Sequence, residues 1–550
     1  MKKIILVLLL LVGVVAGLFY ASGEKQGKIQ KSEKYEVAVE DLISTKLKYI
    51  GEHGVDVRVE GKSLSKFGYK LLIDDEANIY ASELFMEDIM CCSVNIYPDG
   101  HVTVDRGDAS LEFKAAETKT QDDEVYIPIG DHIDELGYRL EFSFVDDMVN
   151  FINTDGGMYL PEAYDMRDHD RVTPVRDQGN EGTCWAFASL GALETTTLPE
   201  EEEIYSVDHM SMNNGFSLDL SEGGEHTMSI AYMAAWRGPV LEKDDEYGDG
   251  ETDESLTAVK HLKEAIIIND RDDNKIKSAI YKYGGVETSI YLEMPYGVDD
   301  SKYYNSETYS YFYNGFEEPN HDLVVVGWDD NYPKEKFAIE PSSNGAFICK
   351  NSWGEEFGDK GYFYISYDDV NICQKSIIYT KLDDPDDYDN IYQTDVLGWV
   401  GQMGFSEESA YFANVYEAKG DETLKAVSFY ATGPDTKFSV FVVTDYDDML
   451  SLNSNRQQVG KGETRYAGYY TVDLTQEINL DKGQKYAIIV SITTPGSERP
   501  IAIECDAGDR TANLDLEDGE GYMSLYGESW HNAEEESANI CLKAFTVDRK

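Results

Sequence analysis

The stretch VTPVRDQGNEGTCWAFASLGALE, residues 172–194, joins a glycine-containing turn directly to a run of helix-forming residues. Gly179 and Gly182 favour a turn, and Cys184 opens a stretch rich in Ala and Leu that predicts a helix. A thiol at a helix N-terminus lies among free backbone N–H groups and at the positive end of the helix dipole, which lowers its pKa. The pattern makes Cys184 a candidate nucleophile.

A glutamine precedes this cysteine at a distance that suits acyl transfer. Gln178 stands six residues before Cys184, on the predicted turn. Its side-chain N–H and the backbone N–H of Cys184 would give two donors for the oxyanion of a tetrahedral intermediate. Loss of one such donor costs about 2.7 to 4 kcal/mol of transition-state stabilisation. We therefore expect Gln178 to contribute to an oxyanion hole.

A base for the thiol is best supplied by His321, one of nine histidines. It begins the apolar run 322–327, which predicts a buried strand that would hold the imidazole on a rigid element. His209 and His226 are alternative bases, but each lies in a predicted loop or helix start. The sequence therefore favours His321.

The histidine needs a partner that fixes its orientation. Asn351, thirty residues later in ICKNSWGEEFGDKGYFYISY, offers a side-chain carbonyl oxygen to the imidazole. Trp353 could cover that hydrogen bond from water. The other interpretation of Trp185 and Trp353 is ordinary core packing.

Three segments resemble the signature blocks of papain-family cysteine peptidases, in that family's chain order. They are DQGNEGTCWAFAS at 177–189, NHDLVVVGWDD at 320–330 and KNSWGEEFGDKGYFYIS at 350–366. The resemblance implies an α+β catalytic unit over residues 160–382. Its two subdomains would be a helical half and a β-barrel-like half. The family uses no metal or other cofactor.

Residue by residue, the resemblance implies the same site as the chemistry above. Gln178 would donate to the oxyanion, Cys184 would attack, His321 would act as base and then as acid, and Asn351 would orient the histidine. Gly223 and Gly224, in SEGGEHTMSIAYMAAWRGPV, resemble the substrate-binding glycines that line the family's cleft. Glycine lets a substrate backbone approach closely and pair as an added strand.

The sequence also departs from the family pattern. Many members have a disulfide-forming cysteine three residues before the nucleophile, where this chain has Glu181. Cys349 is expected to be a buried strand residue. The usual helical inhibitory propeptide pattern is not evident.

Residues 36–153 contain an internal repeat. IYASELFMEDIMCCSVNI from Ile79 and VYIPIGDHIDELGYRLEF from Val125 align so that Tyr80 and Tyr126 lie 46 positions apart. Each copy predicts a strand, a short helix and an alternating strand. This small α+β repeat resembles the duplicated module at the N-terminus of copper amine oxidases, without a histidine cluster for copper.

Residues 391–548 carry an all-β signal, in which TLKAVSFYAT, KFSVFVVT and QKYAIIVSIT are separated by turn residues. The pattern predicts a β-sandwich and resembles the lectin-like domain that follows the catalytic unit in some prokaryotic papain-family proteins, which implies a carbohydrate or surface ligand. The acidic link DDPDDYDN at 383–390 is expected to be a solvated connector, with a calcium site as the alternative.

The amino-acid composition argues against a nucleic-acid partner. Asp and Glu number 105 against 47 Lys and Arg, a formal charge of −58 that repels nucleic acid. Residues 1–23 have the order of a signal peptide, with basic residues, an apolar run and small residues, and the run is nearly long enough to remain as a membrane anchor. Seven cysteines leave at least one thiol unpaired, and Cys505 and Cys541 could pair with each other.

The sequence therefore predicts an exported cysteine peptidase, extracellular or at the cell surface, that hydrolyses peptide bonds through a Cys184 thioester. Its flanking modules would direct it to a surface or glycan. One alternative is a transpeptidase or ligase that passes the same thioester to an amine. Another is a surface adhesin in which the peptidase unit only scaffolds binding modules.

Overall fold

The structure is a computed structural model that describes most of the chain beyond residue 161, namely 162–549 without 200, 270, 294–300 and 517–519. Before that it describes 47–49, 56–59, 62–63, 71–74, 78–90, 92–97, 100–106, 109–121, 124–130, 132–143, 148–153 and 160. The chain forms two compact units, Met1–Pro161 and Glu162–Lys550. The expected signal or anchor segment 1–23 lies outside the described residues. Within the described part, no helix is both long and apolar enough to cross a membrane.

Among its described residues, the N-terminal unit contains three small sheets and helix α3 (Glu83–Asp88). The first sheet has the order β1 (Leu47–Tyr49), β4 (Leu71–Asp74), β5 (Ile79–Ser82), β10 (Glu124–Pro128) and β9 (Lys119–Gln121). The second has the order β11 (Tyr138–Ser143), β12 (Met148–Asn153), β2 (Asp56–Val59) and β3 (Lys62–Ser63). The third has the order β6 (Ser93–Ile96), β7 (Val102–Arg106) and β8 (Ala109–Phe113).

The two predicted repeat copies meet in the first of these sheets. Strands β5 and β10 pair antiparallel, with Pro128 opposite Tyr80 and Tyr126 opposite Ser82, and both tyrosines are buried. The helix expected in the first copy is α3, which Ser82 caps by accepting a hydrogen bond from the Phe85 N–H. The prediction of a helix in the second copy was wrong, because residues 132–137 form turns.

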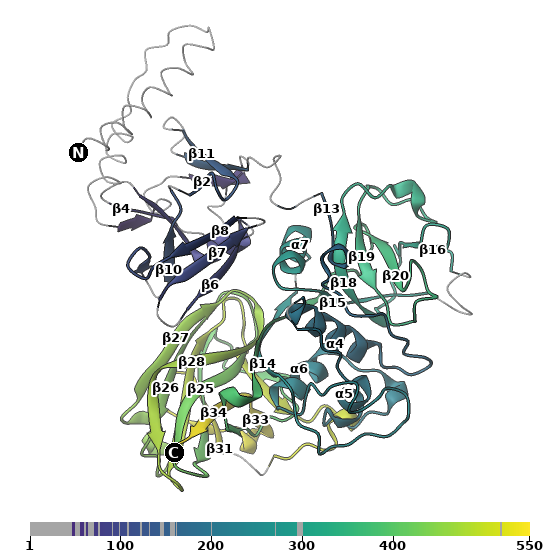
Figure 1. Ribbon diagram of the computed structural model, residues 1–550. Coiled ribbons are helices and arrows are strands. Elements are labelled where there is room, and N and C mark those ends of the chain that lie inside the picture. Colours follow the sequence, from purple (N-terminus) through teal and green to yellow (C-terminus); the bar gives the residue numbers. More distant parts are fainter. Residues whose placement is uncertain are drawn as a thin grey trace, which may run out of the picture. The chain divides into compact units, whose positions relative to one another are not determined.

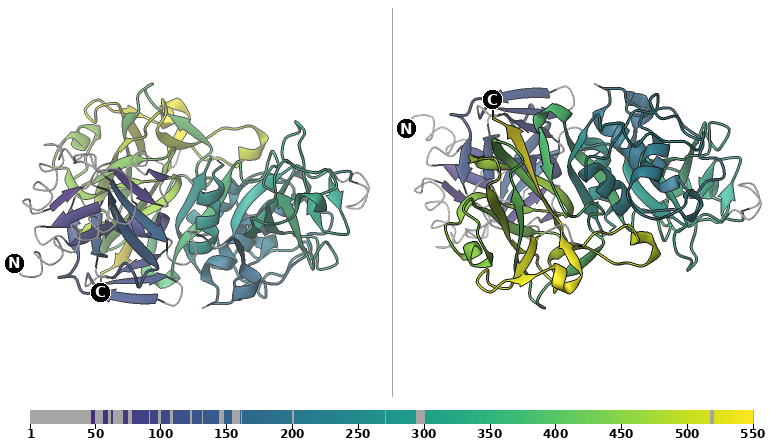
Figure 2. Two further views of the ribbon diagram at one scale, coloured as in Figure 1. Left: turned by 90° about the horizontal axis from the view of Figure 1, so that it is seen from above. Right: turned by 90° about the horizontal axis from the view of Figure 1, so that it is seen from below.

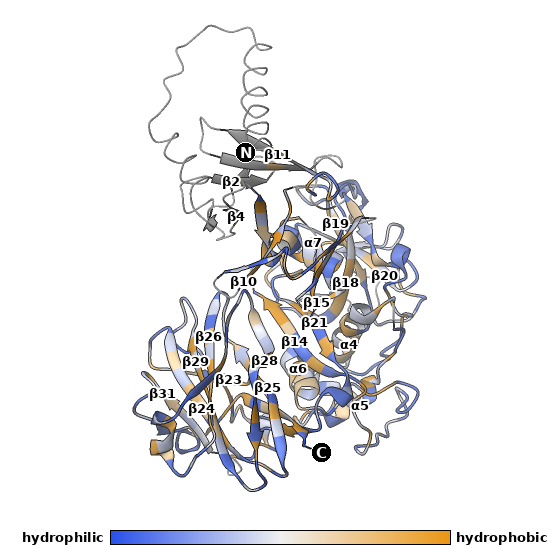
Figure 3. Ribbon diagram, turned by 60° about the vertical axis from the view of Figure 1, so that its left-hand side comes forward, coloured by the Kyte–Doolittle hydropathy of each residue, from blue (hydrophilic) through white to orange (hydrophobic). Residues whose placement is uncertain are grey.

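The second unit is built on a 13-stranded sheet. Its first part, in sheet order, is β16 (Tyr304–Asn305), β17 (Ser310–Tyr311), β20 (Tyr362–Ser366), β19 (Ala346–Lys350), β18 (His321–Asp329), β15 (Val286–Ile290), β21 (Ser376–Asp383) and β14 (His261–Ile268), with β13 (Ala163–Asp165) also beside β18. Figure 3 shows hydrophobic residues along β14, β15 and β21. Such near-continuous apolar strands are typical of a sheet covered on both faces.

Helix α4 (Cys184–Thr197) lies at the centre of this half, where it packs against β18, β21 and β15. Its apolar residues are not confined to one stripe, and most of its side chains are buried, as expected for a helix enclosed on all sides. The neighbouring helices are α5 (Val207–Asn213), α6 (His226–Ala234) and α7 (Asp273–Lys282). Figure 1 shows α4 and α6 side by side. The mixed α+β fold expected for this part is confirmed.

The 13-stranded sheet continues into the C-terminal part through β28 (Ala467–Leu480), β25 (Glu422–Ala431), β34 (Leu542–Asp548) and β22 (Asn390–Tyr392). A second sheet has the order β27 (Gln457–Thr464), β26 (Thr436–Val443), β29 (Lys485–Thr493), β24 (Ser409–Glu417), β31 (Glu520–Ser524) and β32 (His531–Asn532). A third has the order β23 (Gly401–Met403), β30 (Ile501–Cys505) and β33 (Ala538–Ile540). A continuous core of buried residues joins these sheets, so the C-terminal part is β-rich, as expected.

The part of the second unit up to β21 and the C-terminal part are joined by hydrogen bonds between backbone strands. Strand β14 pairs antiparallel with β28, from Glu264 opposite Tyr470 to Ile267 opposite Ala467. In both views of Figure 2 the green and yellow C-terminal strands adjoin the teal helices. The two halves therefore meet through a continuous hydrogen-bonded sheet.

The acidic link between the halves is held by lysines. Asp383 ends β21 and pairs with Lys263, while Asp384 pairs with Lys260. No group of acidic, histidine and cysteine side chains within the described residues is arranged to hold a metal ion.

Candidate active site

Cys184 is the first residue of α4, directly after Thr183 at the N-cap. The backbone N–H groups of Asp322, Trp185 and Cys184 itself act on its thiol. Asp322 directly follows His321 at the start of β18, so the head of α4 meets the head of that strand. Among the described residues, however, no hydrogen bond joins the sulfur to the His321 ring.

His321 and Asn351 are brought together by neighbouring strands. His321 opens β18, and Asn351 follows β19, which pairs antiparallel with β18. His321 Nε2 lies 2.7 Å from Asn351 Oδ1, and both side chains are buried. The same Oδ1 accepts a hydrogen bond from the Ser352 N–H at 2.9 Å, which fixes the amide. Because an amide oxygen only accepts, Nε2 carries the proton, and Nδ1 is left as the basic nitrogen.

Trp353 lies next to this pair. Its ring centroid is 4.8 Å from that of His321, at an interplanar angle of 38°. A ring at this distance limits the access of water to the imidazole, and a hydrogen bond is stronger where water is excluded.

Gln178 is held in a fixed orientation beside Asn351. Its Oε1 accepts a hydrogen bond from Ser352 Oγ at 2.7 Å, and its Nε2 donates to Glu181 O at 2.8 Å. Its backbone N–H also donates to Ser352 O at 2.8 Å. Because a side-chain amide has two N–H donors, one remains for another acceptor.

The resting protonation states are neutral. Burial and the nearby Asp322 carboxylate raise the pKa of the Cys184 thiol to about 11, although backbone N–H groups act in the opposite direction. Burial lowers the pKa of His321 to about 4, against the raising effect of Asn351. The lowering of the thiol pKa expected from the helix N-terminus is therefore outweighed by desolvation. In this state His321 must take the thiol proton when the sulfur attacks.

The predicted substrate-binding glycines lie against the nucleophile's neighbours. A Cβ on Gly224 would lie 2.4 Å from the indole of Trp185, and Gly223 has φ of +79°. The Gly182 N–H donates to Leu220 O at 2.9 Å, which ties the turn before Cys184 to the segment before the glycine pair. A side chain on Gly224 would therefore require Trp185 to shift, whereas Gly223 has open space but a backbone conformation that favours glycine.

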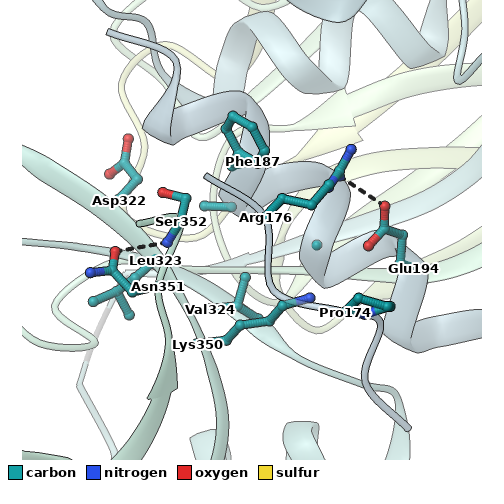
Figure 4. Close-up of a pocket in the computed structure, with 12 residues that line it drawn as sticks. Pro174, Arg176, Phe187, Glu194, Asp322, Leu323, Val324, Lys350, Asn351 and Ser352 are labelled. Atoms are coloured by element: carbon teal, nitrogen blue, oxygen red, sulfur yellow. Dashed lines mark hydrogen bonds and ion pairs between the residues drawn. The ribbon is translucent and has the colours of Figure 1, made fainter. Parts of the chain in front are cut away.

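Behind the site lies a small cavity of about 20 Å³ between α4 and the start of β18, lined by Lys350, Asn351, Ser352 and Glu194 among others (Figure 4). In it Arg176 pairs with Glu194 at 3.1 Å. Lys350 Nζ donates to Thr173 Oγ1 at 2.8 Å, and Thr173 in turn donates to Glu194. A space of this size has room for about one water molecule. This network holds Lys350, the last residue of β19, and so fixes the position of Asn351 that follows it.

Sequence reasoning missed two residues that act on the site. Ser352 contacts both Gln178 and Asn351. Asp322 acts on the Cys184 thiol, and burial raises its own pKa to about 6, against a hydrogen bond from Ser289. Both could have been suspected from the sequence, because Ser352 directly follows Asn351 and Asp322 directly follows His321.

The alternative histidines have other roles. His209 Nδ1 lies 2.7 Å from the Tyr232 hydroxyl. His226 is the first residue of α6, and burial lowers its pKa to about 4. In the part of the chain that the structure describes, neither is hydrogen-bonded to Cys184. Cys505 and Cys541 are free thiols and do not pair with each other, and Cys184, Cys349 and Cys373 are free as well.

A cysteine at a helix head, an oriented histidine and a fixed glutamine, held between a helix and a sheet, form the arrangement expected of a papain-type thiol peptidase. Residues 160–380 match the protein-family model "Papain family cysteine protease", and residues 391–546 match "Lectin like domain". The chain therefore carries a papain-family cysteine peptidase domain followed by a lectin-like domain.

The curated relatives align with about two fifths of this chain. Viral cathepsin of Heliothis zea nuclear polyhedrosis virus is 26% identical over 223 residues, which are 39% of this chain and 54% of the relative. Cathepsin K of Gallus gallus is 30% identical over 240 residues, covering 40% of this chain and 65% of the relative. The chain thus spans less than two thirds of the length of these relatives.

Solved structures extend the similarity into the C-terminal half. The clostridial cysteine protease Cwp84 after propeptide cleavage is 26% identical with a TM-score of 0.63, covering 70% of this chain and 99% of that one. The cysteine protease and lectin-like domains of Cwp84, a surface layer associated protein of Clostridium difficile, give 26% identity and a TM-score of 0.61, covering 71% of this chain and 89% of that one.

Proposed function

We propose that this protein is an exported cysteine peptidase that hydrolyses peptide bonds through a thioester on Cys184. The observation that carries the proposal is the 2.7 Å hydrogen bond between His321 and Asn351, at the strand end that meets the head of α4. The orienting bond leaves Nδ1 of a neutral imidazole to accept the thiol proton.

The steps follow from the residues. His321 Nδ1 takes the proton of Cys184 as the sulfur attacks the substrate carbonyl carbon, and the resulting oxyanion accepts hydrogen bonds from the spare Gln178 N–H and the Cys184 backbone N–H. The tetrahedral intermediate collapses, the C–N bond breaks, and His321 gives its proton to the leaving amine. Water, deprotonated by His321, then attacks the thioester, and the released sulfur regains the proton.

We propose further that the flanking parts localise the enzyme. The C-terminal domain would bind a carbohydrate or another surface ligand, and the chain would act at the cell surface or outside the cell. The similarity to Cwp84, which is described as surface layer associated, supports this location. The repeat at 36–153 would be a spacer, a binding module or a prosegment.

The test compares the wild-type chain with Cys184→Ala on a peptide library. Wild type should release peptides with new carboxyl termini and should be labelled by an epoxide-type thiol reagent, while Cys184→Ala should do neither and should keep its circular dichroism spectrum. Hydrolysis that persists in Cys184→Ala would contradict the proposal. Added amine nucleophiles distinguish a ligase, which would give amide products in place of free acids.

A further inference from the structure

A loop of the lectin-like domain, residues 506–515, contacts the peptidase loop 213–225. Arg510 O accepts a hydrogen bond from the Ser217 N–H at 2.9 Å. The Arg510 guanidinium lies 5.3 Å from the centroid of the Phe216 ring. Backbone, ring and charge contacts therefore all converge on Arg510.

The strongest of these contacts is an ion pair across the two domains. Arg510 Nη1 lies 2.6 Å from Glu225 Oε1. Burial alone would raise the pKa of Glu225, yet that pKa is lowered, because Arg510 supplies an opposite charge and a hydrogen bond. Glu225 directly follows Gly223 and Gly224 and is the N-cap residue of α6. The pair thus joins the lectin-like domain to the substrate-binding glycines.

A short series of contacts runs from Glu225 to the nucleophile. Gly224, next to Glu225, packs so closely on Trp185 that a Cβ would lie 2.4 Å from the indole. Trp185 directly follows Cys184 in α4. A shift of Glu225 would therefore move the glycine pair relative to Cys184.

The lectin-like domain is fixed firmly enough to hold Arg510 in place. Trp236, just after α6, stacks on Phe545 with ring centroids 5.4 Å apart. Gln393 Nε2 donates to Ala235 O at 3.2 Å. These contacts hold the C-terminal end of α6 against the lectin-like domain, and the pairing of β14 with β28 joins the same two domains through the sheet.

Arg510 also has one N–H donor, Nε, without a partner among the described residues. This Nε is buried. Buried N–H groups are normally paired, so the ion pair with Glu225 leaves one donor of Arg510 unsatisfied.

We propose that Arg510 of the lectin-like domain is a positioning residue of the peptidase cleft, which holds Gly223 and Gly224 in their substrate-binding arrangement through its ion pair with Glu225. This proposal rests on the proposed peptidase function. The lectin-like domain then acts on the substrate site through Glu225, and a peptidase unit separated from it would bind peptides more weakly.

The test measures kcat and KM of the full chain on one peptide substrate. Arg510→Met should raise KM about two- to fivefold, the range expected when a partly exposed ion pair is lost. Its kcat should fall by less. Arg510→Lys should restore much of the loss, and the KM difference should shrink at high salt. The matched control is Arg499→Met, an exposed arginine of the same domain, whose KM should equal that of wild type.

Glu225→Gln tests the pair from the peptidase side, and it replaces Arg510→Met if that variant does not fold. The double variant should have the KM of the more affected single variant, because both act through one interaction. Additive effects, or an Arg510→Met KM within the error of wild type, would overturn the proposal. Failure of the peptidase function itself is separate, since the wild-type chain would then show no hydrolysis at all.

Discussion

The His321 ring and the Asn351 amide are thirty residues apart in sequence, and Nε2 of the ring lies 2.7 Å from Oδ1 of the amide. The contact arises because β18 begins with His321 and its antiparallel neighbour β19 ends just before Asn351. The hydrogen bond therefore depends on strand register, and it selects the tautomer that can accept the thiol proton.

Asn351→Ala should lower kcat about 10- to 100-fold with little change in KM, because a hydrogen bond to the imidazolium formed during attack is worth about 1.5 to 3 kcal/mol. Steady-state kinetics on one peptide measures both constants. Asn331→Ala is the control, since Asn331 contacts Glu162 on the surface and should leave both constants unchanged. An unchanged kcat in Asn351→Ala would show that the histidine needs no such partner.

Gln178→Ala should lower kcat about 10²- to 10³-fold, the effect of losing one oxyanion donor. Ser352→Ala should lower kcat less than about tenfold. It removes one neutral hydrogen bond that holds Gln178, worth about 0.5 to 1.5 kcal/mol. Both variants should still be alkylated at Cys184 by iodoacetamide, a reaction without a tetrahedral oxyanion. A larger loss in Ser352→Ala than in Gln178→Ala would contradict this ranking.

The sequence predicted the parts of the site that are local in the chain. The helix that begins at Cys184 and the strand that begins at His321 follow from helix-forming and apolar runs. The raised thiol pKa could not be predicted, because it depends on burial and on the Asp322 carboxylate, which the fold brings to the helix head.

The relation between the domains was not predictable either. The acidic link expected as a boundary lies between β21, which ends at Asp383, and β22, which begins at Asn390. No periodicity, however, indicates that β14 and β28 pair across that boundary, or that Arg510 reaches Glu225. Such contacts join segments far apart in sequence, and one sequence without relatives carries no signal for them.

A buried carboxyl group under α4 should make stability depend on pH. Burial and the nearby Asp322 charge raise the pKa of Glu287 to about 8, although Ser189 and Tyr379 donate hydrogen bonds to it. The folded state therefore binds a proton that the unfolded state releases above its ordinary value near 4.5. The stability from neutral Glu287 is complete below pH 4.5 and is lost as the pH rises through 8.

Glu287→Gln should remove this dependence, because a glutamine carbonyl can accept the same two hydrogen bonds and does not ionise. Urea denaturation between pH 4.5 and 8.5 measures the free energy of unfolding, and each pKa unit corresponds to about 1.4 kcal/mol. The variant should gain stability relative to wild type as the pH rises. Glu335→Gln, at an exposed site, should follow the wild-type curve, and parallel curves for Glu287→Gln and wild type would refute the assignment.

The shared sheet makes the peptidase half depend on its C-terminal partner. A chain of residues 160–390 would lack β28 and would leave the Glu264–Ile267 edge of β14 unpaired, and an exposed apolar edge strand promotes association. Compared with residues 162–550, this fragment should have a lower urea midpoint and should self-associate in sedimentation. Residues 391–550 keep β28, β25 and β34 of the shared sheet, the two smaller C-terminal sheets and the core between them, so this fragment should fold alone with a β-type circular dichroism spectrum. A monomeric 160–390 fragment with an unchanged midpoint would mean that the pairing of β14 and β28 contributes nothing to the stability of the peptidase.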